Sequence, residues 1–221
     1  MKVLIISQGI DGGIAKMSSY LARSLQKAGH NVDHIYVGRP ASSFYPREDA
    51  KFGVKSSFYV TGKSRSLSEI IGIIKSFQFL KNNTDTQYDL VILSGLISLI
   101  LYFRFFKNAY IIFYDHGLPF SFVKIKKFLL RFALPKVNLI VSVADFSLNF
   151  YKKISNNYQS VVIENCITNN IISKSENNFS EIKILMLARI DFIQKDQLTL
   201  VKAAIRAHKQ GLPIKVTFAG G

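Results

Sequence analysis

Short apolar runs alternate with segments of helical periodicity along most of this chain, and that alternation limits the fold more than any other feature. Strands are expected over residues 3–6, 32–37, 57–60, 90–93, 109–114, 139–143, 161–164, 182–188 and 214–218. Apolar residues at helical spacing predict helices over 14–27, 67–80, 123–132, 146–154 and 197–209, whereas residues 38–55 are expected to form a polar loop. Alternating strands and helices are typical of a parallel sheet with helices on both faces, so the expected fold class is α/β.

A change in composition divides the chain into two expected domains. Residues 168–180 are polar and rich in Asn and Ser, unlike the segments on either side. We therefore expect one complete Rossmann-like parallel-sheet domain over residues 1–168, a linker over 169–181 and the start of a second domain over 182–221. The second segment ends in a strand and a glycine turn with no helix after them, which is the pattern of an interrupted domain.

The charge of the chain favours anionic partners. Its 29 Lys and Arg against 14 Asp and Glu give a net charge of +15, which suits a nucleic acid, an anionic membrane surface or a phosphorylated substrate. A basic surface that only faces solvent explains the same composition. No nucleic acid is expected as partner, because the charge is not gathered into a recognised reader motif.

Cysteine content and apolar runs bear on the compartment. The chain has one cysteine, Cys166, so an intramolecular disulfide is excluded. The longest apolar stretch, residues 90–103, is shorter than the roughly 20 residues that a membrane-spanning helix needs. We expect a cytoplasmic protein, with a peripheral position on the inner face of the membrane as a further prediction.

Two cations follow the strand expected at 182–188. Arg189 ends that strand, and Lys195 comes six residues later, just before a helix. Ligands of open α/β sheets bind outside the carboxyl ends of strands, and Arg and Lys are the residues that hold phosphate oxygens. Fixed cations there stabilise a departing diphosphate without a metal, although two solvated surface cations would give the same local pattern.

A glycine-bearing loop lies between the first strand and the first helix. Gly12 and Gly13 open that helix, where free backbone N–H groups can face an anion. The spacing does not match the dinucleotide fingerprint, and no acidic residue stands at the end of the second strand. A tight turn without a ligand remains the alternative.

Two further strand ends carry polar residues. His116 follows the strand at 109–114, where an imidazole can bond a hydroxyl or a phosphate, or instead the neighbouring backbone. Asn165 follows the strand at 161–164, in a loop that faces the ligand or forms an ordinary turn beside a buried Cys166. Carboxylates, cysteines and histidines do not cluster in sequence, so no metal and no cofactor are expected.

Two stretches combine basic and aromatic residues. They are residues 123–132 (VKIKKFLLRF) and 102–107 (YFRFFK). Segments of this kind can rest on anionic lipid headgroups. An ordinary half-buried helix with its lysines outside is the alternative.

In order and spacing, these motifs resemble the retaining glycosyltransferases of the GT-B type, glycosyl transferases group 1 (family 4). The resemblance is carried by the segments 12–14, 28–32, 141–143, 162–167, 188–195 and 218–221, and it spans nearly the whole chain. It implies transfer of a sugar from a nucleotide-diphosphate sugar with retention, in assembly of a cell-surface polysaccharide or glycolipid.

The resemblance also implies roles for individual residues. His116 would contact the donor sugar, Arg189 and Lys195 would hold the diphosphate, and Gly12 and Gly13 would line the acceptor side. Asn165 and Gly220 would lie at substrate-binding turns. Glu164, Cys166, Ala188 and Asp196 depart from the family pattern of Pro or Gly at these turns.

The family's paired donor-binding glutamates are missing from the sequence, which implies a chain that is inactive alone. A fragment, a truncated gene product and a subunit of a split enzyme, completed by a second polypeptide, are all consistent with this. Two other classes remain: a non-catalytic partner subunit, and a nucleotide-binding epimerase or oxidoreductase.

Overall fold

A computed structural model describes residues 1–8, 12–37, 44–59, 74–78, 80–81, 87–106, 108–116, 124–155, 158–165, 181–188, 190, 192 and 195–220. The chain divides into two compact units, Met1–Ile167 and Thr168–Gly221. The expected linker, 169–181, lies outside the described residues apart from Glu181, and the roles assigned to the two domains stay predictions.

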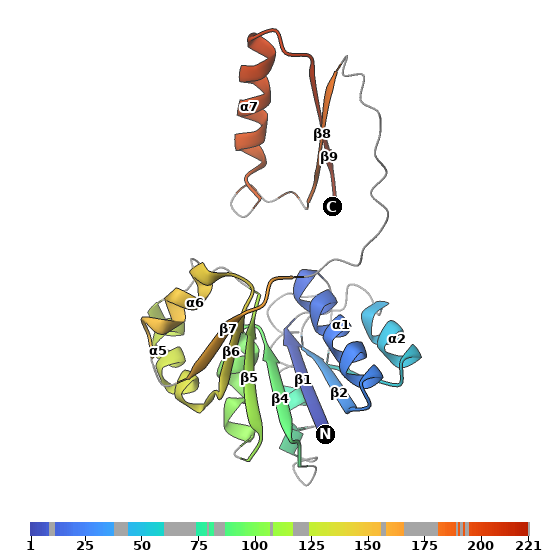
Figure 1. Ribbon diagram of the computed structural model, residues 1–221, viewed down its shortest axis with the longest axis vertical. Coiled ribbons are helices and arrows are strands. Elements are labelled where there is room, and N and C mark those ends of the chain that lie inside the picture. Colours follow the sequence, from blue (N-terminus) through green and yellow to red (C-terminus); the bar gives the residue numbers. More distant parts are fainter. Residues whose placement is uncertain are drawn as a thin grey trace. The chain divides into compact units, whose positions relative to one another are not determined.

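The first unit is built on a sheet in which every pair of neighbouring strands is parallel (Figure 1). The strand order is β3-β2-β1-β4-β5-β6-β7. The strands are β1 (Lys2–Gln8), β2 (Asn31–Val37), β3 (Lys55–Tyr59), β4 (Leu90–Ser94), β5 (Tyr110–Asp115), β6 (Leu139–Ser142) and β7 (Gln159–Val162). The predicted α/β class is therefore confirmed.

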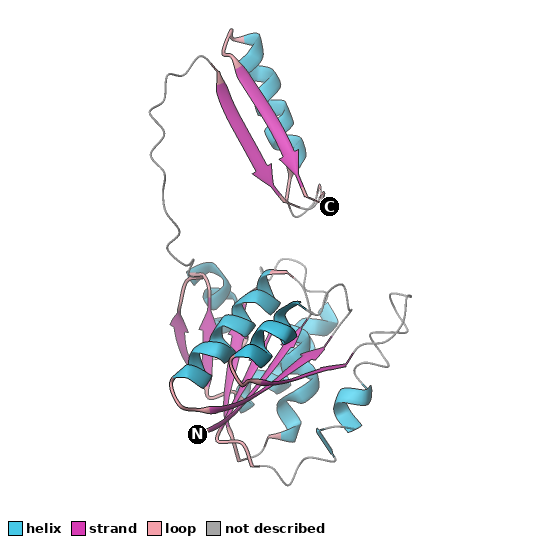
Figure 2. Cartoon of the chain, turned by 90° about the vertical axis from the view of Figure 1, so that its right-hand side faces the viewer, coloured by secondary structure: helices cyan, strands magenta, loops and turns pink. Residues whose placement is uncertain are grey.

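Helices cover both faces of this sheet (Figure 2). They are α1 (Gly13–Lys27), α2 (Phe44–Lys51), α4 (Leu96–Tyr102), α5 (Lys124–Ala133) and α6 (Asp145–Lys152), with short 3-10 turns η1 (Phe103–Phe105) and η3 (Leu134–Lys136). The strands advance in one direction from β1 to β3 and in the other from β4 to β7. Because parallel crossovers are right-handed, the helices of the two halves lie on opposite faces.

Each face of the sheet has its own apolar core, because successive side chains of a strand point to opposite sides. Val3 and Ile5 of β1 pack with Ala22 of α1, whereas Leu4 and Ile6 belong to the larger core on the other face. That larger core includes side chains from α4, α5 and α6. Burial on both faces explains why the central strands are continuous apolar runs.

The expectation of a loop over residues 38–55 is wrong in its middle, where α2 (Phe44–Lys51) is helical. This helix has only eight residues and its buried residues are Pro46 and Asp49, so it shows no apolar stripe. Pro46 is tolerated because it lies in the first turn, where its missing N–H has no helical partner. The expected helix over 67–80 is helical at 74–78 and 80, and its other residues lie outside the described part.

The second unit contains a strand–helix–strand, as predicted. Strands β8 (Ile182–Leu187) and β9 (Ile214–Ala219) pair in parallel, and α7 (Gln197–Lys209) connects them. Gln197 is the one described residue of this unit that is buried. Large apolar side chains such as Leu187, which is 79% exposed, face solvent here.

No helix in the described part of the chain is both long enough and apolar enough to cross a lipid bilayer.

Candidate functional site

The carboxyl ends of the first unit's strands form the candidate site. The strand order reverses between β1 and β4, so the connections that leave these two neighbouring strands diverge to opposite faces of the sheet. In open α/β sheets, ligands bind beside such a reversal, outside the carboxyl ends. Three of the predicted residue groups follow strands that end here: Gly12 and Gly13 after β1, His116 after β5 and Asn165 after β7.

Gly12 and Gly13 form an open amino end of α1. Gly12 has a φ of 92°, a left-handed value that favours glycine. Because glycine has no side chain, it offers no capping group to the helix. A Cβ atom added to either glycine would meet no atom within 4 Å. Both residues are exposed, so the free N–H groups of the first helical turn are accessible to a ligand.

His116 is held in a dry environment at the end of β5. Its ring lies 4.0 Å from that of Tyr114, centroid to centroid. Burial lowers the pKa of His116 to about 4, although the side chain of Asn165 partly opposes this. Both ring nitrogens are buried, and no described group meets either of them with good hydrogen-bond geometry. A neutral imidazole of this kind can donate one hydrogen bond and accept another from a ligand.

Asn165 is the predicted residue that the structure brings close to His116. It is exposed and lies three residues after the end of β7, and its influence on the pKa of His116 places the two side chains together. The strands β5, β6 and β7 are successive neighbours, which explains this proximity. Cys166 lies outside the described residues.

The second unit carries the remaining predicted residues at the carboxyl ends of β8 and β9. Lys195 is exposed in the connection from β8 to α7, and Gly220 follows β9 with a φ of 137°. Ala188 N–H donates to the carbonyl of Ala219 at 2.9 Å, so the two strands end side by side. Arg189 lies outside the described residues, and its convergence with Lys195 stays a prediction.

Asp196 shows why a glycine is replaceable at the start of α7. Its φ of 48° and ψ of 45° lie in the left-handed region, which Asp tolerates better than most residues. Its carboxylate accepts a hydrogen bond from Thr199 N–H at 3.3 Å and so caps the helix. The cap offsets part of the strain that glycine would avoid.

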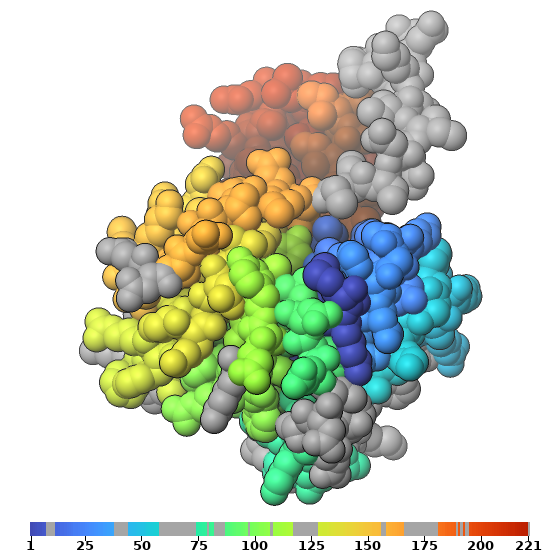
Figure 3. All heavy atoms as spheres, turned by 60° about the horizontal axis from the view of Figure 1, so that its bottom comes forward, coloured from blue at the N-terminus to red at the C-terminus, as the bar shows by residue number. Residues whose placement is uncertain are grey.

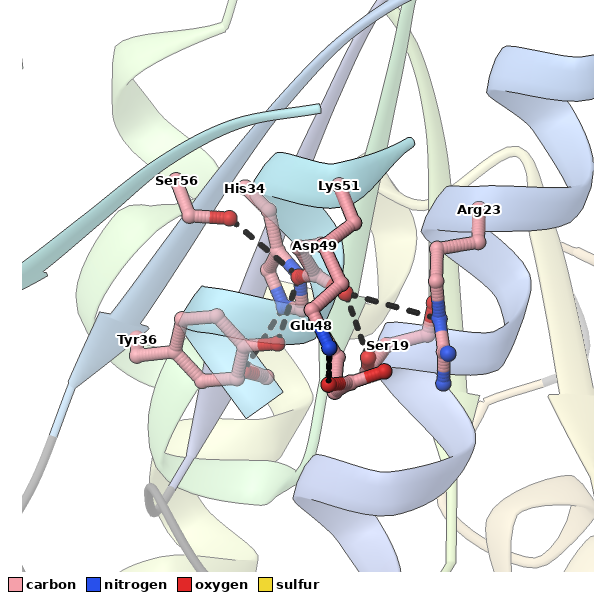
Figure 4. A network of polar contacts seen from close by, with 9 residues as sticks. Ser19, Arg23, His34, Tyr36, Glu48, Asp49, Lys51 and Ser56 are labelled. Atoms are coloured by element: carbon pink, nitrogen blue, oxygen red, sulfur yellow. Dashed lines mark hydrogen bonds and ion pairs between the residues drawn. The ribbon is translucent and has the colours of Figure 1, made fainter. Parts of the chain in front are cut away.

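Sequence reasoning missed a buried polar network beneath the candidate site (Figure 4). The Asp49 carboxylate accepts hydrogen bonds from His34 Nδ1 at 2.9 Å, from the Tyr36 hydroxyl at 2.7 Å and from the Ser19 hydroxyl. Ser56 also donates to it at 3.2 Å, and Arg23 Nε lies 3.7 Å away. The network therefore joins side chains of α1, α2, β2 and β3.

The protonation states within this network follow from its partners. Burial by itself would raise the pKa of Asp49, but the hydrogen bonds from His34, Ser19 and Tyr36 hold that pKa below its usual value. Burial lowers the pKa of His34 despite Asp49, and burial raises the pKa of Tyr36. Because an ionised carboxylate only accepts, His34 donates from Nδ1 and its Nε2 accepts from the Ser7 hydroxyl at 3.0 Å.

Ser7, His34 and Asp49 thus repeat the order of groups in a Ser-His-Asp hydrolase triad. All three side chains are fully buried in the α1-covered side of the sheet, so a substrate cannot reach the Ser7 hydroxyl. The arrangement holds elements together and is not a nucleophile site. His34 and Tyr36 alternate along β2, and this polar alternation in a buried strand was the available sequence signal.

These features define an α/β protein whose first unit has the topology of nucleotide-binding domains. The sequence profile named Glycosyltransferase Family 4 matches residues 11–168. The chain therefore belongs to glycosyltransferase family 4. Gly12, Gly13, His116 and Asn165 lie within the matched segment.

Solved glycosyltransferase structures resemble the whole chain. The lipopolysaccharide outer core galactosyltransferase WaaB, in its apo form, has a TM-score of 0.67 at 12% identity, and the match covers 100% of this chain and 69% of WaaB. Anabaena HepE in complex with UDP and glucose gives 0.63 at 13% identity, over 100% and 70% of the two chains. Sucrose-phosphate synthase from Thermosynechococcus elongatus gives 0.65 at 13%, over 100% and 70%.

At these identities the similarity identifies the fold, which is GT-B. No curated protein matches the sequence. Among the described residues, no group of three or more His, Cys, Asp or Glu could hold a metal ion. The expected absence of metal and cofactor remains a prediction.

Proposed function

We propose that this chain takes part in transfer of a sugar from a nucleotide-diphosphate sugar to an acceptor, with retention of configuration at the anomeric carbon. The observation that carries the proposal is His116, a neutral imidazole at the carboxyl end of the sheet of a family 4 domain, whose buried ring nitrogens meet no described group with good hydrogen-bond geometry. Such a group suits a sugar hydroxyl, because it can donate and accept at once.

The other residues have complementary proposed roles. Arg189 and Lys195 neutralise the departing diphosphate, and Gly220 lets the backbone approach the donor. Gly12 and Gly13 line the acceptor side, and Asn165 orients the imidazole of His116. The HepE structure holds UDP and glucose, so UDP-linked hexoses are the first donors to test.

The acceptor is proposed to be lipid-linked, in assembly of a cell-surface polysaccharide or glycolipid on the inner face of the membrane. The support is the net charge of +15 and the basic, aromatic surface of α5. Anomeric configuration of the product, read by NMR, tests retention.

Calorimetric titration with UDP and UDP-sugars tests the donor assignment. Lys195→Ala and Arg189→Ala should each weaken binding of both ligands at least about 10-fold, since a hydrogen bond to a charged group is lost. His116→Asn should weaken binding of the UDP-sugar only. Lys202→Ala, an exposed lysine on α7, is the matched control and should change neither affinity.

Two results would overturn the donor assignment: absence of nucleotide binding by the wild-type chain, or equal weakening by Lys202→Ala and Lys195→Ala. Adding EDTA to the same titration checks the expectation that no metal is needed.

One observation favours a second candidate, a partner subunit of a split glycosyltransferase that is inactive alone. Strand β8 and helix α7 expose large apolar side chains, among them Leu185, Leu187 and Ile205. Large apolar side chains exposed together on neighbouring elements are typical of a protein interface. Co-purification with a separate donor-domain protein would favour this candidate over the first.

A further inference from the structure

A groove lies at the opposite end of the first unit from the candidate site. It is formed at the amino ends of β5 and β6 and has a volume of about 670 Å³. Phe103, Phe106, Ile111 and Phe132 contribute apolar walls, and Arg104 and Lys136 contribute cations. This size is within the range of roughly 300–1,000 Å³ that is usual for ligand pockets.

The groove joins two basic and aromatic stretches that are separate in the sequence. Phe103, Arg104 and Phe106 come from the 102–107 stretch, and Phe132 comes from the end of the 123–132 stretch. Helix α4, which leads into the first stretch, contacts α5, which contains most of the second. Figure 3 turns the amino end of the sheet toward the viewer and shows the green and yellow-green segments of this region next to each other.

The lining of the groove is amphiphilic and carries positive charge. None of the described residues that line it is acidic. The Arg104 guanidinium lies over the ring of Phe103, 5.5 Å from its centroid, and both Arg104 and Lys136 are exposed. The Asn138 side chain is already engaged, because its Oδ1 accepts from Ile111 N–H at 2.7 Å. An apolar ligand with an anionic group is the complement of such a lining.

The surface beside the groove has the same character. Helix α5 exposes Phe128 (59%) and Phe132 (53%), whose rings are in contact at 5.0 Å, together with Arg131. A second hollow, of about 450 Å³, adjoins the groove and shares Lys136 with it. Exposed phenyl rings among cations are what a protein surface needs to lie in the headgroup region of an anionic membrane.

We propose that the groove binds an anionic phospholipid of the membrane surface, with an acyl chain against Phe103, Phe106 and Phe132 and the headgroup phosphate between Arg104 and Lys136. Charge complementarity selects this occupant: the groove has cations without acids, and the adjoining helix adds exposed rings and Arg131. The site is separate from the sugar-transfer residues and does not depend on the identity of the donor.

Tryptophan fluorescence tests whether an acyl chain enters the groove, because the sequence contains no tryptophan. Phe106→Trp places a single reporter in the groove, and Phe44→Trp places one on the exposed surface of α2 as control. Vesicles of phosphatidylglycerol with brominated acyl chains should quench the first reporter and leave the second unchanged. Vesicle binding without quenching at position 106 would overturn the proposal.

A second pair of variants tests the charge and does not alter the apolar walls. The double variant Arg104→Ala with Lys136→Ala is compared with Arg47→Ala and Lys55→Ala, exposed residues at α2 and β3 with the same change in net charge. Sedimentation with phosphatidylglycerol vesicles should show about 30-fold weaker binding for the groove variant. The control variant should bind within about 3-fold of the wild type.

Equal weakening of both double variants would mean diffuse attraction and would overturn the proposal, as would equal binding to phosphatidylglycerol and phosphatidylcholine vesicles. Nucleotide titration without vesicles is a separate measurement. A chain that binds vesicles and no nucleotide contradicts the proposed sugar transfer alone, and one that binds nucleotide and no vesicles contradicts the lipid site alone.

Discussion

His116 shows how burial can prepare a single side chain for a ligand. At neutral pH the ring is uncharged because its pKa is held near 4 by its dry surroundings. A charged imidazole would only donate hydrogen bonds, whereas the neutral ring also accepts one. The same burial makes the stability of the folded protein sensitive to acid.

Acidification should therefore destabilise the protein partly through His116. Its pKa is about 4 in the folded chain and near 6.5 in the unfolded chain, so the unfolded chain binds the proton more tightly. The free energy of unfolding should fall as pH drops from about 6.5 toward 4, by roughly 3 kcal/mol from this residue. Urea unfolding at both pH values measures the loss.

The variant His116→Gln should lose less stability than the wild type over this range. His208→Gln, which alters an exposed histidine on α7, should leave the wild-type loss unchanged. His34 acts in the same direction, because burial lowers its pKa as well, so part of the loss remains in both variants. Identical losses for His116→Gln and the wild type would contradict the assignment.

At the residue scale, strand ends were the informative positions. Gly12, His116 and Asn165 could be placed at the same end of the sheet, because the carboxyl ends of parallel strands lie together. The contacts of Asp49 could not be predicted, since its partners come from three other elements and each looks like an ordinary polar residue in its own segment. Only packing shows that the His34 and Asp49 side chains meet.

Among the elements, α2 depends most on polar contacts. This helix has no apolar stripe, and helices of eight residues are marginal unless tertiary contacts hold them. The contacts in question are those that Asp49 makes with Ser19, His34, Tyr36 and Ser56. This also explains why sequence periodicity, which measures apolar faces, predicted α1 and α7 well and α2 not at all.

Asp49→Asn should be strongly destabilising for this reason. The amide keeps the shape of the carboxylate but loses its charge. Its single NH2 group then faces either Ser19, which donates to Oδ1, or His34 and Tyr36, which donate to Oδ2. Breaking a buried pair of this kind costs roughly 3 kcal/mol in the free energy of unfolding. Chemical denaturation followed by circular dichroism measures the change.

Glu48→Gln on the same helix is the matched control. Its partner is the exposed Lys51, at 2.5 Å, and an ion pair of this kind contributes at most about 1 kcal/mol. If the two variants were destabilised equally, the network around Asp49 would not be what holds α2.

The two units of the chain differ in how much apolar surface their described residues bury. The described apolar residues that are buried all belong to Met1–Ile167. The alternation of strands and helices predicted both units, since each is built from parallel strands joined by helices. That no described apolar residue of the second unit is buried was not predictable, because periodicity shows a potential interior face and not what covers it.

A chain of residues 1–167 should consequently fold with nearly the stability of the full chain. We expect its thermal midpoint to lie within about 2 °C of the full-length value, because the apolar burial is retained. A peptide of residues 168–221 should show no cooperative unfolding transition, since a two-stranded sheet with one helix buries too little apolar surface. Scanning calorimetry of the three chains decides the point, and a midpoint lowered by more than about 10 °C in the shorter chain would contradict it.

The polar network around Asp49 has a consequence for motion in the first unit. The Asp49 carboxylate, on α2, accepts hydrogen bonds from one other helix, α1, and from the strands β2 and β3, and His34 extends these contacts to β1 through Ser7. Displacing any one of these elements would leave the buried Asp49 carboxylate without some of its hydrogen-bond donors. The strands β1 to β3 with α1 and α2 should therefore open as a single cooperative unit, and their backbone amide protons should exchange with solvent at similar rates.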